Sequence, residues 1–423
     1  MSNKNKAKLF LRLKVNFLNL YTSIIAKDSW KKIKKCDVLL LKHDNNHNYL
    51  YENKKYSTLI DSIAYFYEKN GYTYQTVAKP FSRFIGEGVS GKPLSVNSSY
   101  FIYGVLNKVF KKLFNSNVFN RTSLWIRVLE RAKPTIVIGV QPDMYTCQAC
   151  YLANIPVYDL QHGAIESSVR HYSSVKVLSD PSYALPSGFL LWNKNSKETL
   201  RRLMNIDKNL FVVGHPFLSR FQKNLDDDRL VKSAFDEWNA PFVNNKPNIL
   251  VTTQYGLKEY YKTDFDILPR ELIELIKETQ DIYNFFLRAH PVDRNKQISF
   301  FIDEFSEYSN SINFIEVTEM PLPILLSYTS LHITYHSAVT LECSMYGLKT
   351  ILLNPELGEG RTLETLFLDE RENGLAELVT INKDKMSESI KNSLDDSQQF
   401  DEMYLNTELE FLKLYERNGL PYE

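Results

Sequence analysis

The sequence predicts an α/β fold built from two doubly wound parallel-sheet domains. Short apolar runs of four to seven residues recur along the chain, and most are followed by a stretch with helical periodicity. This alternation is typical of strands that are buried on both faces of a parallel sheet. A polar stretch at 223–248 separates the runs into two sets, and a length of 423 residues suits two domains with a core each.

The first set of predicted strands belongs to an N-terminal domain. Its apolar runs lie at 37–41, 134–140, 156–160, 188–192 and 210–213. Helical patterns follow several runs, and one predicted helix starts near Pro142. We therefore expect an N-terminal Rossmann-like domain over residues 1–215 and an interdomain linker with a helix over residues 216–247.

The second set predicts a similar C-terminal domain. Its runs lie at 248–252, 283–288, 312–316, 330–335, 350–353 and 377–381. Predicted helices between them lie at 268–280, 322–328, 338–346 and 384–394. We expect a second Rossmann-like domain over 248–395 and a C-terminal helix over 396–423 that can cross back to the first domain. The two domains are expected to face one another, with ligands at the carboxyl ends of their strands.

The composition excludes several classes of protein. Lys plus Arg number 51 and Asp plus Glu 50, and the resulting net charge of +1 gives no reason to expect a nucleic-acid partner. Four cysteines are too few for a disulfide framework and fit a reducing cytoplasm. Cys147 and Cys150 form a C-x-x-C without the second pair that a zinc site needs, and we interpret them as half-buried thiols on a helix. No run of about 18 apolar residues occurs, so we expect a cytoplasmic protein without a membrane-spanning helix.

Residues 7–26 (AKLFLRLKVNFLNLYTSIIA) have the pattern of a basic amphipathic helix. The favoured interpretation is a first helix packed on its own domain, because such helices are not specific to one role. The alternative is peripheral contact with the inner face of the plasma membrane.

Polar side chains follow the predicted strand at 330–335. His336 and Ser337 come directly after it, and Ser337 is placed to cap the next helix. Free N–H groups and the positive end of the helix dipole attract a phosphate. Thr340 is expected on the rim of this site, and Glu342 within reach of a ribose diol. The other interpretation is a plain helix cap with Glu342 on the surface.

A histidine also ends the predicted strand at 283–288. His290 follows it, and Pro291 stops the strand. An imidazole there can donate to a phosphate oxygen or stack near a base. A single histidine in this position is more often structural, but the Ser337 helix in the same predicted domain favours a role in donor binding.

The first domain offers candidate catalytic bases. The run at 156–160 is followed by Gln-His-Gly at 161–163. His162 is the first candidate, because an unperturbed imidazole titrates near neutral pH. Glu166 and Asp143 are alternatives, although an acidic residue at a helix start, such as Asp143, usually complements the helix dipole.

A glycine-rich segment at 86–92 has the spacing of a Walker A loop. Pro93 follows in place of Ser or Thr, so no hydroxyl is available for Mg²⁺, and no clear strand or helix flanks the segment. An ATPase or kinase is therefore excluded. We expect instead a flexible loop that closes on an acceptor, with Arg83, Gly91 and Lys92 as its candidate residues.

These motifs together resemble GT-B-fold glycosyltransferases of bacterial capsule and lipopolysaccharide biosynthesis, in pattern over 134–390 and most sharply over 283–355. The Ala-His-Pro at 289–291 is similar to the His-Pro motif of transferases with cytidine-activated donors. These include capsule Kdo- and sialyltransferases and the CDP-glycerol glycerophosphotransferases. The Gln-His-Gly at 161–163 is similar to a first-domain motif whose His is a proposed base. The segment FVVGHP at 211–216 resembles the Gly-x-Pro crossover between the two domains.

The resemblance implies roles for residues of the second domain. In that superfamily a Ser-led helix holds phosphate and a Glu five residues after the Ser often binds ribose, and Ser337 and Glu342 match these positions. Ala338 and Val339 depart from the second Ser, or Ser-Gly-Gly, of most relatives. Thr334 stands where retaining enzymes often carry the first Glu of Glu-x7-Glu, which favours an inverting mechanism.

The resemblance therefore implies an inverting glycosyltransferase whose first domain (1–215) binds the acceptor and whose second domain (248–395) binds the nucleotide sugar. Its donor would be CMP-linked Kdo or a nonulosonic acid, and its acceptor a hydroxyl of a bacterial surface polysaccharide or glycolipid. No Asp-x-Asp lies in a suitable loop, so we expect no metal and no other cofactor. The alternatives are a UDP-sugar donor, a phosphotransferase that moves glycerol or ribitol phosphate from a CDP donor, a UDP-sugar isomerase, and a catalytically silent scaffold.

Overall fold

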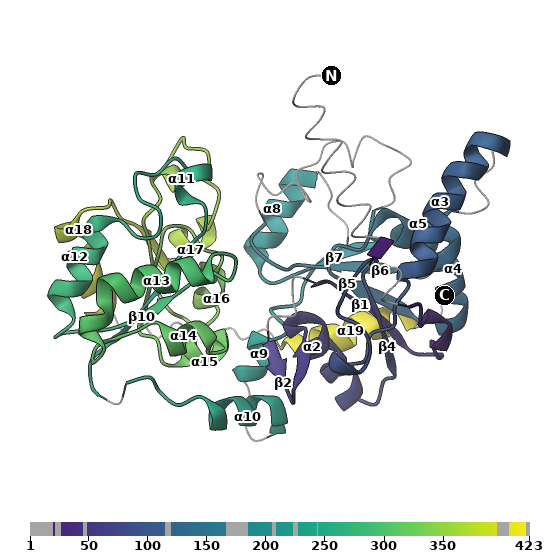
Figure 1. Cartoon of the computed structure of the whole chain (residues 1–423), viewed down its shortest axis with the longest axis horizontal. Coiled ribbons are helices and arrows are strands. Elements are labelled where there is room, and N and C mark those ends of the chain that lie inside the picture. Colours follow the sequence, from purple (N-terminus) through teal and green to yellow (C-terminus); the bar gives the residue numbers. More distant parts are fainter. Residues whose placement is uncertain are drawn as a thin grey trace. The chain divides into compact units, whose positions relative to one another are not determined.

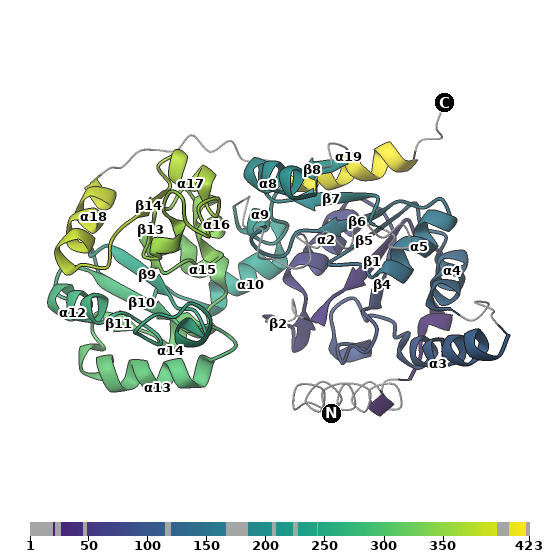
Figure 2. The same cartoon turned by 90° about the horizontal axis from the view of Figure 1, so that it is seen from above.

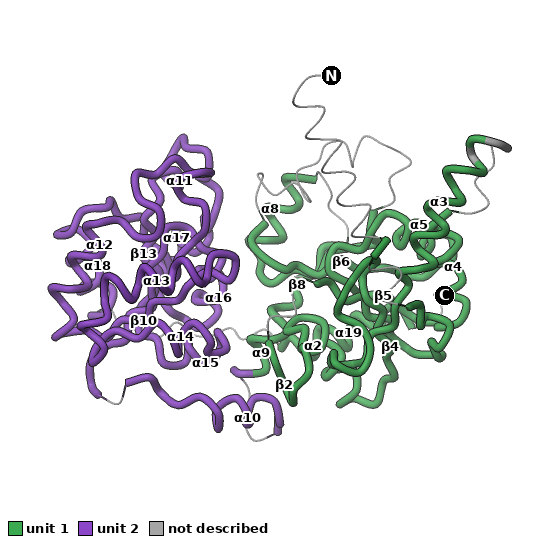
Figure 3. The backbone as a smooth tube through the Cα atoms, in the orientation of Figure 1, with its two compact units in different colours: residues 1–220, 405–423 green, residues 221–404 purple. Residues whose placement is uncertain are grey.

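The structure is a computed structural model, which describes residues 20–21, 27–44, 49–114, 120–165, 185–204, 209–222, 227–242, 244–395 and 406–419. The chain forms two compact units (Figure 3). Unit 1 comprises residues 1–220 and 405–423, and unit 2 comprises residues 221–404. Each unit is built around its own parallel sheet.

The sheet of unit 1 has six parallel strands. Their order is β4 (Tyr74–Ala78), β1 (Val38–Lys42), β5 (Ile136–Gly139), β6 (Val157–Leu160), β7 (Gly188–Leu191) and β8 (Leu210–Val212). The first crossover leads from β1 to β4 on one side, and β5 then pairs with β1 on the other side. The sheet therefore reverses its strand order between β1 and β5, and such a switch point is where open α/β sheets bind ligands.

Helices surround this sheet. They are η1 (Trp30–Lys32), α2 (Thr58–Lys69), η3 (Gly86–Gly88), α3 (Asn97–Phe114), α4 (Arg121–Ala132), α5 (Met144–Leu152), α8 (Lys194–Met204), α9 (Leu218–Phe221) and α19 (Thr407–Gly419). A hairpin of β2 (Tyr49–Tyr51) and β3 (Lys54–Tyr56) precedes α2. Helix α19 lies against α2, and α4 against α5 on the opposite face of the sheet (Figure 1).

Unit 2 has a second sheet of six parallel strands. Their order is β11 (Ile312–Asn313), β10 (Asn284–Arg288), β9 (Asn248–Thr252), β12 (Leu331–Thr334), β13 (Thr350–Leu352) and β14 (Ala376–Leu378). Strand β9 pairs with β10 on one side and with β12 on the other, so the switch point lies between β9 and β12.

Short helices connect the strands of unit 2. They are α10 (Arg229–Glu237), α11 (Leu257–Tyr260), α12 (Arg270–Thr279), α13 (Arg294–Phe305), η5 (Ser306–Tyr308), α14 (Ile315–Glu319), α15 (Leu322–Ser327), α16 (Val339–Ser344), η6 (Pro355–Leu357), α17 (Leu368–Glu372) and α18 (Lys383–Asp395). The core is formed by fully buried strand residues such as Ile249, Phe285 and Ile333 together with Phe301 and Phe305 of α13. Aliphatic and aromatic burial of this kind is the main stabilising contribution to such a domain.

The predicted fold class of two Rossmann-like α/β domains is confirmed. Strand β4 was not predicted, because Tyr74, Gln75 and Thr76 interrupt its apolar pattern. This strand lies at the edge of the sheet, where its first two residues are only half-buried. The strand predicted at 312–316 is reduced to Ile312–Asn313, and the chain turns into α14 directly afterwards. No helix in the described part of the chain is long and apolar enough to cross a membrane.

Candidate functional site

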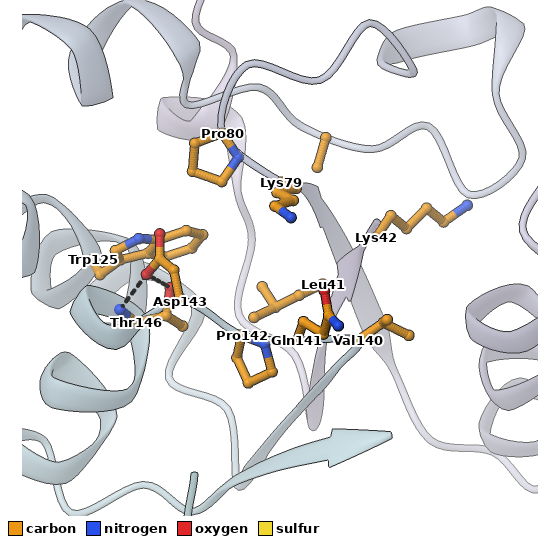
Figure 4. Close-up of a pocket in the computed structure, with 11 residues that line it drawn as sticks. Leu41, Lys42, Lys79, Pro80, Trp125, Val140, Gln141, Pro142, Asp143 and Thr146 are labelled. Carbon is orange, nitrogen blue, oxygen red and sulfur yellow. Dashed lines mark hydrogen bonds between the residues drawn. The ribbon is translucent and has the colours of Figure 1, made fainter. Parts of the chain in front are cut away.

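A pocket in unit 1 lies at the switch point of the sheet (Figure 4). It is lined by residues at the carboxyl ends of β1 and β4, by residues that follow β4 and β5, and by residues of α4 and α5: Leu41, Lys42, Ala78, Lys79, Pro80, Trp125, Val140, Gln141, Pro142, Asp143 and Thr146. Most of these side chains are apolar. Lys79, Gln141 and Asp143 add hydrogen-bonding groups, so the pocket offers an apolar floor and a few polar contacts.

Asp143 is the N-cap of α5. Its Oδ1 accepts hydrogen bonds from the Thr146 backbone N–H and hydroxyl, each at 2.8 Å, and its Oδ2 accepts from the Tyr100 hydroxyl at 2.8 Å. These three bonds fix the carboxylate and occupy most of its favourable acceptor positions. The arrangement is that of a capping residue, as the dipole argument anticipated, and it disfavours Asp143 as a mobile proton acceptor.

His162 follows β6 and lies within reach of the same pocket. Its Nε2 is 3.2 Å from the amide nitrogen of Gln141, which lines the pocket. Since an amide nitrogen only donates, Nε2 of His162 is the acceptor and the ring proton is assigned to Nδ1. Gln141 has a positive φ of 48°, and its backbone N–H donates to the buried Asp159 carboxylate at 2.8 Å. Asp159 therefore stabilises the strained turn that brings Gln141 to the histidine. The alternative base Glu166 lies outside the described residues.

Two residues at this pocket were not predicted from the sequence. His43 follows β1 and is buried, and Lys79 follows β4 and lines the pocket. The Lys79 ammonium lies 2.6 Å from Nε2 of His43. Burial lowers the pKa of Lys79, and the charges of Asp44 and Asp143 oppose that shift. His43 lies two residues after the apolar run at 37–41, and this position was the available signal for it. Lys79 follows β4, a strand that the sequence did not predict.

The predicted acceptor loop does not line this pocket. Gly91 and Lys92 line a different groove, and Arg83 is exposed. The Lys92 ammonium pairs with Glu87 at 2.8 Å on the surface. The loop is also fixed rather than free to close, because the Gly91 carbonyl accepts from the hydroxyl of Thr76 at 2.6 Å.

Further hydrogen bonds fix the same loop. Ser90 N–H donates to the Lys55 carbonyl at 2.9 Å, and the Ser90 carbonyl accepts from the buried Lys42 ammonium. Lys42 also forms a buried ion pair with Asp61. The expectation of a loop that closes on an acceptor is therefore not supported by its hydrogen bonds.

In unit 2, two histidines are joined by one hydrogen-bond network at the switch point. The Gln254 side-chain oxygen accepts from His336 N–H at 2.9 Å, and its backbone carbonyl accepts from the Gln297 amide at 2.7 Å. The Gln297 oxygen accepts from His290 N–H and from the Thr253 hydroxyl, each at 2.6 Å. The network places the loops after β9, β10 and β12 beside one another and fixes the backbone of both histidines. Strand β10 ends at Arg288, before Ala289, His290 and Pro291.

Both histidines of this network are held in the neutral form. Burial lowers the pKa of His336 to about 4, and burial also lowers the pKa of His290 although Asp293 opposes the shift. His336 Nδ1 lies 2.9 Å from the Asn354 amide nitrogen, and His290 Nδ1 accepts from Val292 N–H at 3.2 Å. With Nδ1 as acceptor, each ring keeps its proton on Nε2. Each imidazole is then an uncharged hydrogen-bond donor.

Ser337 is near the start of α16 but is not its N-cap. The capping position is Ala338, while Ser337 Oγ accepts from Val339 N–H at 3.3 Å. Helix α16 has only six residues, so its dipole is weaker than the sequence suggested. Thr340 is buried and does not lie on a rim, and its hydroxyl has no hydrogen-bond partner among the described residues.

Glu342 is half-buried in unit 2, where its carboxylate interacts with the guanidinium of Arg288. Burial raises the pKa of Glu342 to about 7, and the guanidinium of Arg288 partly offsets this shift. The Arg288 guanidinium donates to the carbonyls of Val317 and Met320 at 2.6 and 2.7 Å. Within the described residues the Glu342 carboxylate accepts no hydrogen bond. It is therefore available to a hydroxyl of a ligand.

The described residues include no group of three His, Cys, Asp or Glu side chains that could hold a metal ion. Cys147 and Cys150 both lie on α5 and are buried. Burial raises the pKa of Cys150 to about 12, and the pKa of Cys147 rises for the same reason. Such thiols are poor nucleophiles and poor metal ligands at neutral pH.

Comparison with known proteins gives similarity at the level of the fold. No family model matches the chain, and no curated protein matches it by sequence. UDP-GlcNAc 2-epimerase from Methanocaldococcus jannaschii superposes with a TM-score of 0.54 at 16% identity, over 90% of this chain and 99% of that chain. The wall teichoic acid polymerase TagF superposes with a TM-score of 0.56 at 13% identity, over 98% and 95% of the two chains. MnaA of S. aureus, in a co-structure with UDP, gives 0.51 at 12% identity, over 92% and 99%.

Identities this low show the fold alone. The chain has the GT-B type of fold, in which two Rossmann-like domains each carry a parallel sheet.

Proposed function

We propose that the protein is a glycosyltransferase that moves a sugar from a nucleotide-activated donor to a hydroxyl group of a saccharide or glycolipid. The proposal rests on one observation: each of the two sheets has a site at its switch point. Unit 2 has neutral His290 and His336 joined through one network, with Glu342 in the same domain. Unit 1 has His162 hydrogen-bonded to a pocket residue at its own switch point. We further propose that a donor bound to unit 2 and an acceptor bound to unit 1 come together during the reaction.

The donor nucleotide is assigned to unit 2. His290 and His336 donate from Nε2 to phosphate oxygens, and the Ser337 hydroxyl adds a third donor. Glu342 accepts from the ribose diol, since its carboxylate has no other hydrogen bond among the described residues. The donor that fits the His-Pro resemblance is a CMP-linked acidic sugar such as Kdo or a nonulosonic acid, and a UDP-sugar is the next choice.

The acceptor is assigned to unit 1, where His162 acts as the general base. The acceptor oxygen attacks the anomeric carbon, the bond from that carbon to the phosphate oxygen breaks, and the acceptor proton passes to Nε2 of His162. Attack from the face opposite the leaving nucleotide inverts the anomeric centre. Before the transfer, Nε2 accepts from the Gln141 amide at 3.2 Å, and this bond gives way to the one from the acceptor hydroxyl because Nε2 has a single lone pair.

A nucleotide panel tests the donor assignment. A bound nucleotide stabilises the folded protein by RT ln(1 + [L]/Kd), so thermal shifts with CMP, CDP, UDP, GDP and ADP identify the base. We expect a cytidine nucleotide to give the largest shift. The variant His336→Ala should lose most of that shift. Equal, negligible shifts for all five nucleotides would rule out the donor site.

Substitution of His162 tests the base. His162→Ala should lower kcat by about 10²–10⁴ while nucleotide binding persists, because only proton transfer is removed. The measurement is initial rates with saturating donor, together with the thermal shift of the same variant. Unchanged turnover would transfer the role to Glu166 or Asp143.

Leaving-group stabilisation by neutral imidazoles requires no metal. We therefore expect full activity after dialysis against excess chelator, measured as initial rate before and after treatment. A chelator-sensitive activity restored by added Mg²⁺ or Mn²⁺ would contradict this part of the proposal.

A second candidate is a phosphotransferase that moves glycerol or ribitol phosphate from a CDP donor. It is supported by the fold similarity to TagF, for which a soak with CDPG is known. The same residues would serve, but the product would contain phosphorus from the donor. Mass spectrometry of the product distinguishes the two, since sugar transfer leaves donor phosphorus on the released nucleotide.

A further inference from the structure

Two exposed tyrosines adjoin the two histidines of unit 2. Tyr255 and Tyr261 lie in the segment 253–269 between β9 and α12, which we call the β9 loop, and they are 41% and 44% exposed. The Tyr255 ring centre is 4.7 Å from that of His290. The Tyr261 ring centre is 4.4 Å from that of His336. We call Tyr255 and Tyr261 the tyrosine pair. Ligand sites are commonly lined by aromatic rings, so these two rings are candidates for contact with the donor.

Local contacts hold the β9 loop in place. Leu257 is buried, and its carbonyl accepts from the Tyr261 N–H at 3.0 Å. Gly256 has a φ of 68°, and a Cβ there would clash with the ring of Tyr260. Gln254, at the start of the loop, belongs to the network that joins the two histidines. The tyrosine pair therefore extends from a turn that is fixed by its own contacts.

The β9 loop and Glu342 lie on opposite faces of the unit 2 sheet. Helices α12 and α18 lie on one face, and α15 and α16 lie on the other (Figure 2). Leu268, near the end of the loop, belongs to the core cluster that α12 and α18 share with the sheet. Phe265 of the loop contacts Tyr335, which packs against the same cluster. Glu342 lies on α16, and the two histidines follow their strands at the edge of the sheet, between the two faces.

This placement assigns the tyrosine pair to one part of the donor. In the proposed function, the two histidines bind phosphate and Glu342 binds ribose. Ribose and the transferred group are attached to opposite sides of the phosphate portion of a nucleotide-activated donor. The transferred group therefore extends from the histidines towards the face opposite Glu342, where the tyrosine pair lies.

Aromatic rings discriminate between classes of transferred group. A pyranose ring presents a flat patch of C–H groups, whose partial positive charge is attracted to the negative face of an aromatic ring. The contact also removes apolar surface from water. Glycerol and ribitol are acyclic and have no such patch, and they lose more rotational freedom when they are held against a surface. A stacking surface beside the phosphate site therefore favours a ring.

We propose, on the basis of the proposed function, that the tyrosine pair stacks on the transferred group of the donor and that this group is a ring sugar. Tyr255 and Tyr261 are then specificity determinants. The nucleotide binds without them, and they add affinity only for a donor that carries a sugar ring. This role favours sugar transfer over the transfer of glycerol or ribitol phosphate.

Calorimetric titration of the full chain tests this assignment. Three pairs of ligands are compared: CMP with CMP-N-acetylneuraminic acid, UDP with UDP-GlcNAc, and CDP with CDP-glycerol. In each pair, the Kd of the nucleotide divided by the Kd of its conjugate measures what the transferred group adds. In the variant Tyr255→Leu/Tyr261→Leu, this ratio should fall about five- to tenfold for a pair with a sugar ring and stay constant for CDP with CDP-glycerol. A shift of the histidines affects both members of a pair alike and cancels in the ratio.

Two control variants separate stacking from other effects. Tyr255→Phe/Tyr261→Phe keeps both rings and removes both hydroxyls, so it should keep the ratio of the unaltered chain. Tyr260→Leu changes a third tyrosine of the β9 loop, which is 69% exposed and lies against Gly256, and it should also keep that ratio. Circular dichroism establishes that each variant is folded. An equal fall in Tyr260→Leu would show that the ratio depends on the shape of the loop, and would overturn the proposal.

Three further results would overturn the proposal. Unchanged ratios in the leucine double variant, with nucleotides still bound, would assign the tyrosine pair to the base or to the histidines and leave the proposed function standing. A fall confined to CDP with CDP-glycerol would mean that the tyrosine pair holds an acyclic polyol. Absence of binding for all six ligands would overturn the proposed function and this assignment with it.

Discussion

At the scale of single residues, the chemistry of the unit 2 site depends on contacts between distant segments. The sequence predicts that His290, His336 and Ser337 follow apolar runs at one edge of a parallel sheet, and that Glu342 lies in the helix after Ser337. It could not predict their ionisation. His336 is kept neutral by burial and contacts Asn354 from another loop. These environments form only when segments far apart in the chain come together.

Glu342 gives a prediction about pH. Its folded pKa of about 7 lies above the ordinary 4.5, so between these values the folded state holds a proton that the unfolded state releases. Stability from this group is therefore lost as pH rises through that window. The glutamine of Glu342→Gln cannot ionise. The free energy of unfolding of this variant, relative to that of the unaltered chain, should therefore increase between about pH 5 and about pH 8. Urea unfolding at both pH values is the measurement, and parallel curves for the two proteins would contradict it.

At the scale of elements, the switch point of unit 1 depends on a close approach between β1 and β5. Gly139 lies opposite Leu41 in the ladder, and a Cβ at Gly139 would come within 2.7 Å of the Leu41 Cβ. The apolar runs predicted both strands, since buried parallel strands need no alternation. The sequence could not predict that β4 would pair with β1, because its side chains are half polar. For that reason Lys79 was missed as a pocket residue.

Gly139→Ala should therefore lower the free energy of unfolding of unit 1 by about 1–3 kcal/mol, the usual cost of overpacking a tight contact. Gly163→Ala is the matched control, because a Cβ at Gly163 meets nothing within 4 Å and its φ is not positive. Chemical denaturation of the two variants side by side is the measurement. A Gly139→Ala variant as stable as the control would show that β1 and β5 separate at low cost.

At the scale of the whole molecule, unit 1 is assembled from two separate parts of the chain. Helix α19 follows unit 2 in sequence but packs in unit 1, where Phe411 is fully buried and its carbonyl accepts from the Tyr67 hydroxyl at 2.9 Å. The sequence predicts a C-terminal helix from its periodicity, and such a helix can cross back to the first domain. Its contacts could not be predicted, because Tyr67 is 344 positions away in the sequence.

Phe411→Ala should destabilise unit 1 by about 3–5 kcal/mol and leave unit 2 unchanged, because a cavity remains where the ring was. Tryptophan fluorescence is a suitable probe, since Trp30, Trp125 and Trp192 lie in unit 1 and only Trp238 lies in unit 2. Leu409→Ala is the control on the same helix, because Leu409 is 42% exposed. Loss of stability in both units together would instead indicate that they unfold as one.

Because α19 completes unit 1, the order of translation also determines when each unit can finish folding. Unit 2 is contiguous, so it has all of its strands as soon as it has left the ribosome. The sheet of unit 1 is translated earlier, yet Phe66 and Tyr67 lack their contacts with Phe411 until residues 407–419 emerge. The half of the protein that is made first is thus the half that is completed last, and a ribosome that stalls inside unit 2 leaves unit 1 without the helix that packs on Phe66 and Tyr67.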